Sequence, residues 1–298
     1  MEEQNTSTTG IFAETELIVT AKKTVYHIDL NGDQIADDVI VVGDQGRVAE
    51  ISAFFSAIEH KTEHREFITH TGTFNGKRLT VLSTGIGTDN IDIVVNELDA
   101  AVNIDLEKRR LKPQRRSLNI IRLGTSGALQ EGIPVNGLVV SEYAIGLDGL
   151  LNFYSGTENI FENNISEAFK IHTHWPATLP FPYCVKSDEA LFNKFAEGNY
   201  SGITATAPGF YGPQGRTLRL NPAICNLNEL LTSFDYAGKK ISNFEMETSA
   251  LYGLGKMLGH SCLTVCVVIA NRITRQFTTD YKTSVQHLIS STLERLTG

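Results

Sequence analysis

The chain has 298 residues, of which 41% are hydrophobic and 20% are charged, and its formal net charge is −8. This composition is ordinary for a globular protein. The net negative charge and the lack of any run of five basic residues argue against a nucleic-acid partner or an anionic membrane surface. The four cysteines form no CxxC pair, so we expect no disulfide framework, no metal site and a reducing, cytoplasmic location. We also expect no signal peptide and no membrane span.

The N-terminal part of the chain predicts a polar tail followed by a strand and a helix. Met1–Gly10 has the composition of a disordered segment, and Thr24–Leu30 carries a lone histidine, His27. Residues 38–43 (DVIVVG) form a β-branched run that predicts a strand. A helical pattern follows over 48–58, after Arg47. Strand, glycine, arginine and helix together suit an anion at the start of a helix.

A hairpin, a helix and a basic segment come next. Residues 64–71 and 78–84 predict two strands joined by the Asn75-Gly76 turn. The second strand ends at Gly85-Ile86-Gly87, and a helix is predicted over 90–102. The Gly-x-Gly lacks the third glycine of a dinucleotide fingerprint. Residues 105–116 hold six basic residues without an aromatic residue, which favours a solvated loop over a nucleic-acid patch.

The segment 119–130 (NIIRLGTSGALQ) predicts a buried strand that stops at a sharp Gly/Thr/Ser bend after Arg122. Such a bend offers an arginine, hydroxyls and N–H groups to an anion, although an ordinary strand-to-loop turn is the alternative. A strand is predicted over 137–145, and residues 148–182 are expected to be polar and irregular. His172 and His174 lack a further ligand, so a metal is not expected there.

The C-terminal part again alternates helices and strands. The predicted helices are 188–196, 227–234, 248–258 with Gly259 at its end, and 280–296, and the predicted strands are 202–207, 241–244 and 261–270. Alternation of this kind indicates a mixed, largely parallel sheet with helices on both faces. Polar clusters follow several strands, so they are expected to meet at one sheet edge. They combine arginines (Arg47, Arg122, Arg272), the loop 209–216 and Glu245-Met246-Glu247. Such a set suits an anion, a sugar diol and a flat heterocycle.

Eight segments in this order resemble the nucleoside phosphorylase family, of the uridine phosphorylase type. They are VYHIDL, VVGDQGR, HREF, STGIG, RLGTSGALQ, FYGPQGR, NFEMETSAL and IANR. The resemblance implies a three-layer α/β sandwich around a mixed, partly barrel-like sheet. It also implies a tail over 1–23 and a single domain over 24–298. The implied enzyme is a pentosyltransferase of pyrimidine salvage that needs no cofactor besides its co-substrate, inorganic phosphate. The implied partners are the nucleoside and phosphate, in a homodimer or a hexamer of dimers.

The resemblance also assigns roles to residues. The phosphate-binding set is Gly43, Arg47, Arg122, Thr125 and, from a neighbouring subunit, Arg65. Ribose would be held by His27, Met246 and Glu247, with Glu245 supporting, and His27 would reach across the dimer. The base pocket would contain Gly127, Phe210, Gln214 and Arg216. The catalytic residues would be Arg122, Glu247 and Arg216. Taken alone, Glu245 and Glu247 could equally mark a helix start, and Gln214 and Arg216 could equally belong to a solvated loop.

The implied reaction is phosphorolysis. An oxocarbenium-like sugar forms, phosphate attacks it, and the leaving uracil anion is stabilised by Gln214 and Arg216. Purine enzymes of a related branch carry an aspartate where this chain has Asn271, which favours a pyrimidine base here. The family's Pro-Ser pair is replaced by Asp89-Asn90, so a monovalent cation is not inferred. A broader or purine nucleoside phosphorylase, or a non-catalytic nucleoside-binding homologue, remains the alternative.

Overall fold

The structure is a computed structural model that describes residues 10–298, so most of the predicted disordered segment 1–10 lies outside the described residues. The chain divides into two compact units. The first takes residues up to Gly85 together with Ile93–Asn119, and the second takes Ile86–Asp92 and Ile120–Gly298. The single domain expected over 24–298 stays a prediction. Among residues 10–298, no helix is long and apolar enough to cross a membrane.

A four-stranded mixed sheet forms the centre of the first unit. Strand β1 pairs in parallel with β4, and β4, β3 and β2 pair antiparallel; their bounds are Asp38–Val42, Lys77–Ser83, Phe67–Phe74 and Ala57–His64. Every residue of β1 is buried, as expected for its β-branched run. The short helix α1 (Gln45–Ser52) follows β1, and most of α2 (Thr88–Asn103) also belongs to this unit.

The predicted Asn75-Gly76 hairpin is confirmed. Both residues have positive φ, 48° and 77°, which is the backbone conformation that a two-residue hairpin turn needs. The predicted helix over 48–58 is wrong at its C-terminal end. The chain leaves the helix after Ser52, and Ala57 begins β2, which pairs with β3. Pairing with the neighbouring strand β3 therefore overrides the local helical pattern.

The basic segment 105–116 is built into the first unit. The two-residue strands β5 (Ile104–Asp105) and β6 (Arg110–Leu111) form a small hairpin. The Arg116 guanidinium pairs with Asp37 at 2.5 Å and donates to the carbonyl of Gly32 at 2.9 Å. These contacts give the segment a structural role as a loop that binds the unit's own backbone.

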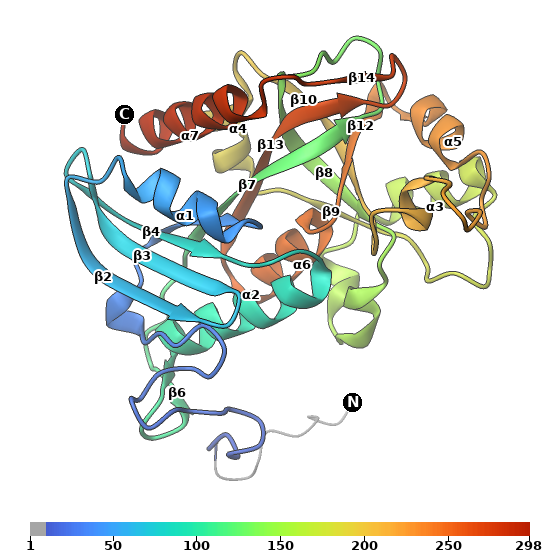
Figure 1. Ribbon diagram of the computed structural model, residues 1–298. Helices are drawn as coiled ribbons and strands as arrows, with labels where there is room; N and C mark the ends of the chain where they lie inside the picture. The colour runs from blue at the N-terminus through green and yellow to red at the C-terminus, as the bar shows by residue number, and fades with distance from the viewer. Residues whose placement is uncertain (1–9) are drawn as a thin grey trace. The chain divides into compact units, whose positions relative to one another are not determined.

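The second unit is organised around a ring of five strands, visible in Figure 1. Strands β7, β12, β10, β8 and β13 pair in this order, and β13 also lies next to β7, so the ring closes. Their bounds are Asn119–Ala128, Lys239–Glu245, Tyr200–Thr206, Leu138–Gly146 and Ser261–Asn271. The pairs β8–β10 and β10–β12 are parallel, whereas β7–β12 and β8–β13 are antiparallel. The sheet is therefore mixed and barrel-like, and the expectation of a largely parallel sheet is wrong.

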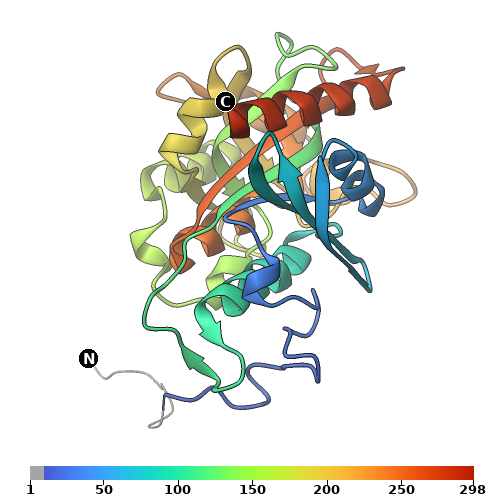
Figure 2. The same ribbon diagram turned by 90° about the vertical axis from the view of Figure 1, so that its left-hand side faces the viewer.

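Helices cover this ring, and short strands extend it. The helices are α3 (Asn163–Thr173), α4 (Glu189–Ala196), α5 (Leu227–Ser233), α6 (Thr248–Leu258) and α7 (Tyr281–Thr297). The short strands are β9 (Tyr183–Lys186), β11 (Asp235–Tyr236) and β14 (Gln276–Phe277). The long helix α7 runs beside α4, as Figure 2 shows. Helix α6 ends at Gly259, whose φ of 82° confirms the predicted C-terminal glycine.

Two predictions for this unit are corrected by the structure. The strand that begins at Asn119 does not bend at Gly124-Thr125-Ser126-Gly127 but continues to Ala128. Its last residues pair with β12, because Gly127 and Ala128 face Phe244 and Asn243. The segment 148–182, expected to be irregular, contains helix α3, which buries Ile165 and Phe169 in the core.

Candidate active site

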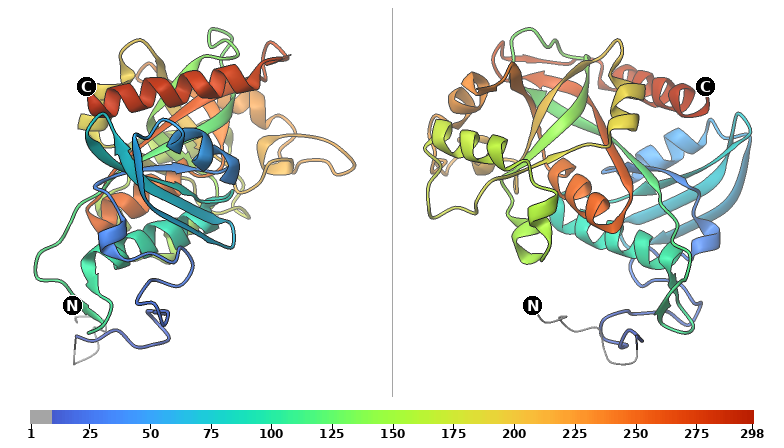
Figure 3. Two further views of the ribbon diagram at one scale, coloured as in Figure 1. Left: turned by 60° about the vertical axis from the view of Figure 1, so that its left-hand side comes forward. Right: turned by 180° about the vertical axis from the view of Figure 1, so that it is seen from behind.

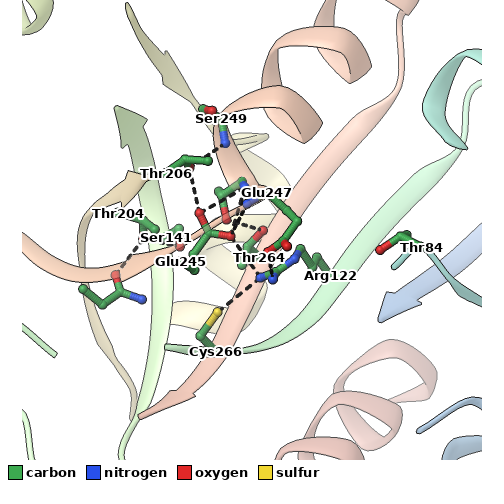
Figure 4. Close-up of polar contacts among 12 residues, drawn as sticks. Thr84, Arg122, Ser141, Thr204, Thr206, Glu245, Glu247, Ser249, Thr264 and Cys266 are labelled. Carbon is green, nitrogen blue, oxygen red and sulfur yellow. Dashed lines mark hydrogen bonds and ion pairs between the residues drawn. The ribbon is translucent and has the colours of Figure 1, made fainter. Parts of the chain in front are cut away.

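A buried arginine held between two glutamates is the centre of the second unit's polar interior (Figure 4). Arg122 lies on β7, and Glu245 and Glu247 stand at the end of β12 and the start of α6. Arg122 Nη1 lies 3.2 Å from Glu245 Oε2, and Arg122 Nη2 donates to Glu247 Oε2. All three side chains are at least nine-tenths buried. Charges this deeply buried require partners of opposite charge, and Arg122 is the shared partner of both glutamates.

The two glutamates differ in how fully they are engaged. Glu245 Oε1 accepts from the Thr206 hydroxyl at 2.6 Å, and its Oε2 accepts from the backbone N–H groups of Glu247 and Thr248 at 2.9 and 3.0 Å. Glu247 Oε1 accepts from the Gly87 N–H at 2.8 Å. Glu245 is thus fixed in place by the start of α6, whereas Glu247 relies on Gly87 and Arg122.

The charges of this cluster affect one another. Burial by itself lowers the pKa of Arg122, but the carboxylates of Glu247 and Glu245 outweigh burial and raise it. Burial raises the pKa of Glu247, Arg122 opposes that shift, and Glu245 adds to it. Arg122 therefore stays positively charged, and its guanidinium is a fixed cation inside the barrel.

Gly124 leaves room for the Arg122 guanidinium. A Cβ on Gly124 would lie 2.3 Å from Arg122 Nη1 and 2.9 Å from Cys266 Sγ. Only glycine leaves the guanidinium room to fold back along the strand toward Glu245. Cys266 is buried and lies 3.4 Å from Arg122 Nη1, and burial raises the pKa of this thiol to about 12.

The loop 209–216 forms a second cluster, in which Gln214 and Arg216 meet. Arg216 Nη1 donates to Gln214 Oε1 at 2.6 Å and to the Phe210 carbonyl at 2.5 Å. The guanidinium also lies 3.7 Å from the centre of the Phe210 ring, a cation–π contact. Gln214 is buried, and Arg216 is half-buried. The predicted association of these three base-pocket residues is therefore present.

Arg272, one of the arginines predicted to suit an anion, lies near this loop. Burial and the charge of Arg272 lower the pKa of Arg216 to about 10, which still leaves Arg216 ionised at neutral pH. A Cβ on Gly127 would lie 3.7 Å from Arg272 Cγ, so Gly127 and Arg272 are neighbours. Two guanidinium groups near each other favour an electronegative ligand at this place.

The side chain of Asn271, by contrast, is hydrogen-bonded to the backbone on both sides of its amide. Its Nδ2 donates to the carbonyls of Gln130 and Ile133 at 2.9 and 2.8 Å. Its Oδ1 accepts from the N–H groups of Ile273 and Thr274, each at 2.9 Å. A side chain whose amide is fully engaged in this way is not placed to exchange a proton with a ligand.

A cavity of about 760 Å³ adjoins the loop 209–216 within the second unit. Arg216 and Tyr211 line it from this loop, and Asp148, Trp175 and Leu179 line it from the segment 148–182. The opposite wall comes from residues 218–224, which belong to the connection between β10 and α5 drawn in light orange in Figure 3. The segment 148–182 thus forms part of a cavity next to the predicted base-binding residues.

The remaining predicted residues of the second unit lie on the same elements. Thr125 is half-buried on β7, three positions beyond Arg122, and Met246 is half-buried between the two glutamates in sequence. Sequence analysis missed Thr206 and Gly87 as hydrogen-bond partners of the glutamates. Thr206 is the last residue of a buried strand, and no local pattern marks it. Gly87 belongs to the Gly-x-Gly turn of the STGIG segment, whose sequence does not show that its N–H group bonds a glutamate.

The first unit holds four further predicted residues. Gly43 and Arg47 flank the start of α1, where Asp44 caps the helix by accepting from the Gly46 N–H at 2.9 Å. Arg47 is buried. His27 Nδ1 lies 2.6 Å from Glu97 Oε1, and Glu97 also accepts from the backbone N–H groups of His27 and Ile28.

Arg65 stands at the tip of the turn between β2 and β3. Its φ is 56°, and its Nη2 donates to the Tyr26 hydroxyl at 3.3 Å. Its guanidinium also lies 5.5 Å from the centre of the Tyr26 ring. Tyr26 precedes His27, so Arg65 and His27 lie on neighbouring segments of the first unit.

Comparison with known proteins places these residues in a family. The model of the phosphorylase superfamily matches residues 37–296. The chain belongs to the phosphorylase superfamily. A uridine phosphorylase of Thermococcus kodakarensis is 30% identical over 272 residues, covering 89% of this chain and 84% of the relative. A DeoD-type purine nucleoside phosphorylase of Clostridium perfringens is 29% identical over 264 residues, covering 85% of this chain and 89% of the relative.

Solved structures agree with this membership. A Trypanosoma brucei nucleoside phosphorylase, described as showing uridine phosphorylase activity, superposes with a TM-score of 0.84 at 30% identity, covering 94% of this chain and 99% of that one. The predicted resemblance and the predicted nucleoside phosphorylase-like α/β fold with a partly barrel-like sheet are confirmed. The chain is an enzyme of the pentosyltransferase class, as the sequence predicted.

Proposed function

We propose that this nucleoside phosphorylase cleaves uridine with inorganic phosphate, giving uracil and ribose 1-phosphate for pyrimidine salvage. The observation that carries the proposal is the pairing of Gln214 with Arg216 beside Arg272. An amide and guanidinium groups offer hydrogen bonds to the carbonyl oxygens and the N–H of uracil. They also place positive charge where the departing base becomes an anion.

The buried cluster around Arg122 supports the assignment of the phosphate and ribose contacts. Its guanidinium is held by Glu245, and its Nε has no hydrogen-bond partner among the described residues, so we assign this group to a phosphate oxygen. Glu247, which has few other partners, is suited to accept hydrogen bonds from the ribose hydroxyls. We assign Met246 to packing on the sugar, and Thr125 to a further phosphate contact. In the first unit we assign Gly43, Arg47 and Arg65 to phosphate and His27 to ribose.

The proposed reaction begins with loss of the base. The glycosidic bond lengthens, the sugar becomes an oxocarbenium-like cation, and negative charge moves onto uracil, where Gln214 and Arg216 stabilise it. Phosphate then attacks the anomeric carbon, forming the new C–O bond. These donors accelerate the reaction because they bind the separated charges of the transition state more strongly than neutral uridine. The reaction needs phosphate as co-substrate and no other cofactor.

We also propose that the enzyme is a cytoplasmic homo-oligomer whose subunits share active sites. Arg65 and His27 are assigned to a site of a neighbouring subunit, in a homodimer or a hexamer of dimers in the cytoplasm. If this is right, an Arg65→Ala subunit mixed with an Arg122→Met subunit restores part of the activity, because one of the two sites of the mixed dimer is intact. Equal inactivity of the mixture and of each variant alone contradicts a shared site.

Purine cleavage is the second candidate, because one relative is named as a purine nucleoside phosphorylase. The hydrogen bonds of Asn271 speak against it, since the place where purine enzymes carry an acid holds an amide bound to the fold. The test is release of free base from uridine, thymidine and inosine, each with and without phosphate. The proposal predicts phosphate-dependent release from uridine and little from inosine. Comparable release from inosine contradicts the pyrimidine assignment, and phosphate-independent release indicates a hydrolase. Binding of uridine without any release indicates a non-catalytic homologue.

A further inference from the structure

The cavity beside the loop 209–216 has the size and lining of a ligand site. Its volume of about 760 Å³ lies in the range of small-molecule pockets, roughly 300–1,000 Å³. Most lining side chains are apolar and include Leu147, Trp175, Leu179, Ile224 and Leu227. The aromatic rings of Trp175 and Tyr211 in this lining suit an apolar group that contains a ring.

The polar groups of the cavity determine which ligand charge it favours. Arg216 and Arg219 contribute guanidinium groups to the lining. The single acidic side chain of the lining, Asp148, is already engaged, because its carboxylate accepts from the Tyr183 hydroxyl at 2.8 Å and from the Ser249 hydroxyl at 2.9 Å. The charge that the cavity still offers is therefore positive, which favours an anionic group on the ligand.

Arg216 connects this cavity to the loop that we assign to the base. The same guanidinium that lines the cavity donates to Gln214 Oε1 and to the Phe210 carbonyl. A carboxylate is a stronger acceptor for a guanidinium than an amide or a backbone carbonyl. A bound carboxylate therefore competes for Arg216 with the contacts that hold it beside Gln214.

We propose that the cavity is a second ligand site for a small aromatic carboxylate, with the rings among the apolar side chains and the carboxylate at Arg216 and Arg219. We further infer that its occupation draws Arg216 from Gln214 and weakens the binding of the nucleoside. This second part rests on the proposed function, whereas the existence of the site does not.

The first test measures binding directly and needs no turnover. We would titrate the full-length protein with 1-naphthoate by calorimetry, and with 1-naphthalenemethanol as the uncharged control of the same shape. The proposal predicts one naphthoate site per chain and at least about tenfold weaker binding of the alcohol. No binding of naphthoate at millimolar concentration, or equal affinity of acid and alcohol, overturns the proposal.

Two variants then locate the site. Ala223→Trp places an indole in the cavity wall, and Arg219→Ala removes a guanidinium that the proposed nucleoside site does not use. Each variant is expected to lower naphthoate affinity by about tenfold or more. Arg275→Ala removes an exposed arginine outside the cavity and serves as the matched control. If naphthoate binds Ala223→Trp and the parent protein equally, the ligand lies elsewhere and the proposal is wrong.

The coupling is tested on phosphorolysis of uridine. Naphthoate is expected to raise the KM for uridine in the parent enzyme and to lose this effect in Ala223→Trp, whose own KM without naphthoate stays unchanged. Unchanged KM at saturating naphthoate refutes the coupling. Absence of uridine turnover without naphthoate refutes the proposed function, while the binding experiment still decides whether the site exists.

Discussion

Arg122→Met is the substitution that tests the buried charge cluster most severely. Methionine has a similar length but no charge, so Glu245 and Glu247 lose their common cation while each remains about 96% buried or more. Removal of one partner from a buried ion pair costs about 3–5 kcal/mol, because the remaining charge is desolvated without compensation. Glu245 retains its bonds from Thr206 and Thr248, so we place the expected loss of unfolding free energy at about 3 kcal/mol at pH 8.

The loss of unfolding free energy caused by Arg122→Met should depend on pH. Without Arg122, the pKa of Glu247 rises further above its ordinary value, so the folded variant binds protons that the unfolded chain releases. Stability of the variant is then greatest below the unfolded-state pKa of glutamate, about 4.3. It falls as pH rises through the raised folded-state pKa. The stability difference from the parent should therefore grow between pH 5 and pH 8.

The assay is urea unfolding of both proteins across this pH range, with unchanged m-values as the check that the same transition is compared. Lys170→Met is the control, because Lys170 pairs with Glu167 at 3.6 Å on the surface, and such pairs contribute about 0–1 kcal/mol. Adding Glu247→Gln to Arg122→Met should restore part of the loss. A loss below about 1 kcal/mol that does not change with pH would refute the account of the cluster as mutually compensating buried charges.

Three further predictions concern catalysis. In a kcat/KM profile for uridine, activity should rise with pH through the raised pKa of Glu247, because its ionised form accepts the ribose hydroxyls; Glu247→Gln should be weakly active and lack this rise. Gly124→Ala should lower kcat/KM by about 100-fold or more while circular dichroism stays native, because the added methyl group occupies the space of the Arg122 guanidinium. Gln214→Leu and Arg216→Met should each lower kcat/KM for uridine by about 100-fold, since each removes a donor to the departing base.

Each of these predictions has an outcome that contradicts it. If the Glu247→Gln enzyme keeps the parent's pH profile, the rise of kcat/KM with pH belongs to the titration of another group. Gly124→Ala at full activity would mean that Arg122 need not fold back along β7. Full uridine activity in Arg216→Met would remove this residue from the base site. Arg275→Ala, an exposed arginine of the same unit, is the control for nonspecific loss of positive charge.

Local rules predicted the elements whose conformation is set by neighbouring residues. The Asn75-Gly76 turn and the glycine at the end of α6 have the positive φ values that their positions demand. The β-branched run of β1 and the apolar run of β13 are strands because their side chains are buried. In these cases the sequence pattern and the tertiary structure favour the same conformation, so the prediction holds.

Tertiary contacts explain what local rules missed. Gly124 looked like a turn residue, but it is a strand residue that makes space for Arg122, and this space depends on Cys266, 142 positions away along the chain. Residues 57–64 are mostly exposed and become a strand through pairing with β3. Helix α3 packs its apolar face into a core built by distant strands. Gly124 and helix α3 thus depend on partners far away in sequence, whereas β2 depends on its hairpin partner β3.

The candidate active site likewise combines features that the local sequence predicted with features that depend on tertiary contacts. The loop 209–216 indicated an amide beside an arginine, and this association is present. The ion pairs of Arg122 with Glu245 and Glu247 were not predicted, because β7 and β12 come together only in the fold. Thr206 and Gly87 were not predicted as partners of the glutamates, because their importance comes from position rather than from a motif. Arg272 was predicted among the arginines that suit an anion, and it lies beside Gly127 and affects the pKa of Arg216. The cavity lined by residues 148–224 was also beyond sequence reasoning, since it forms from two loops that only the fold brings together.

Phosphorus NMR of the products tests the central claim most directly. Uridine and inorganic phosphate are incubated with the enzyme, and ribose 1-phosphate is measured together with uracil and residual phosphate. The account predicts one ribose 1-phosphate for each uracil released, with equal consumption of phosphate and no such signal when inosine replaces uridine. Uracil together with free ribose, at constant phosphate, would contradict phosphorolysis and with it the assignment of Arg122 to phosphate.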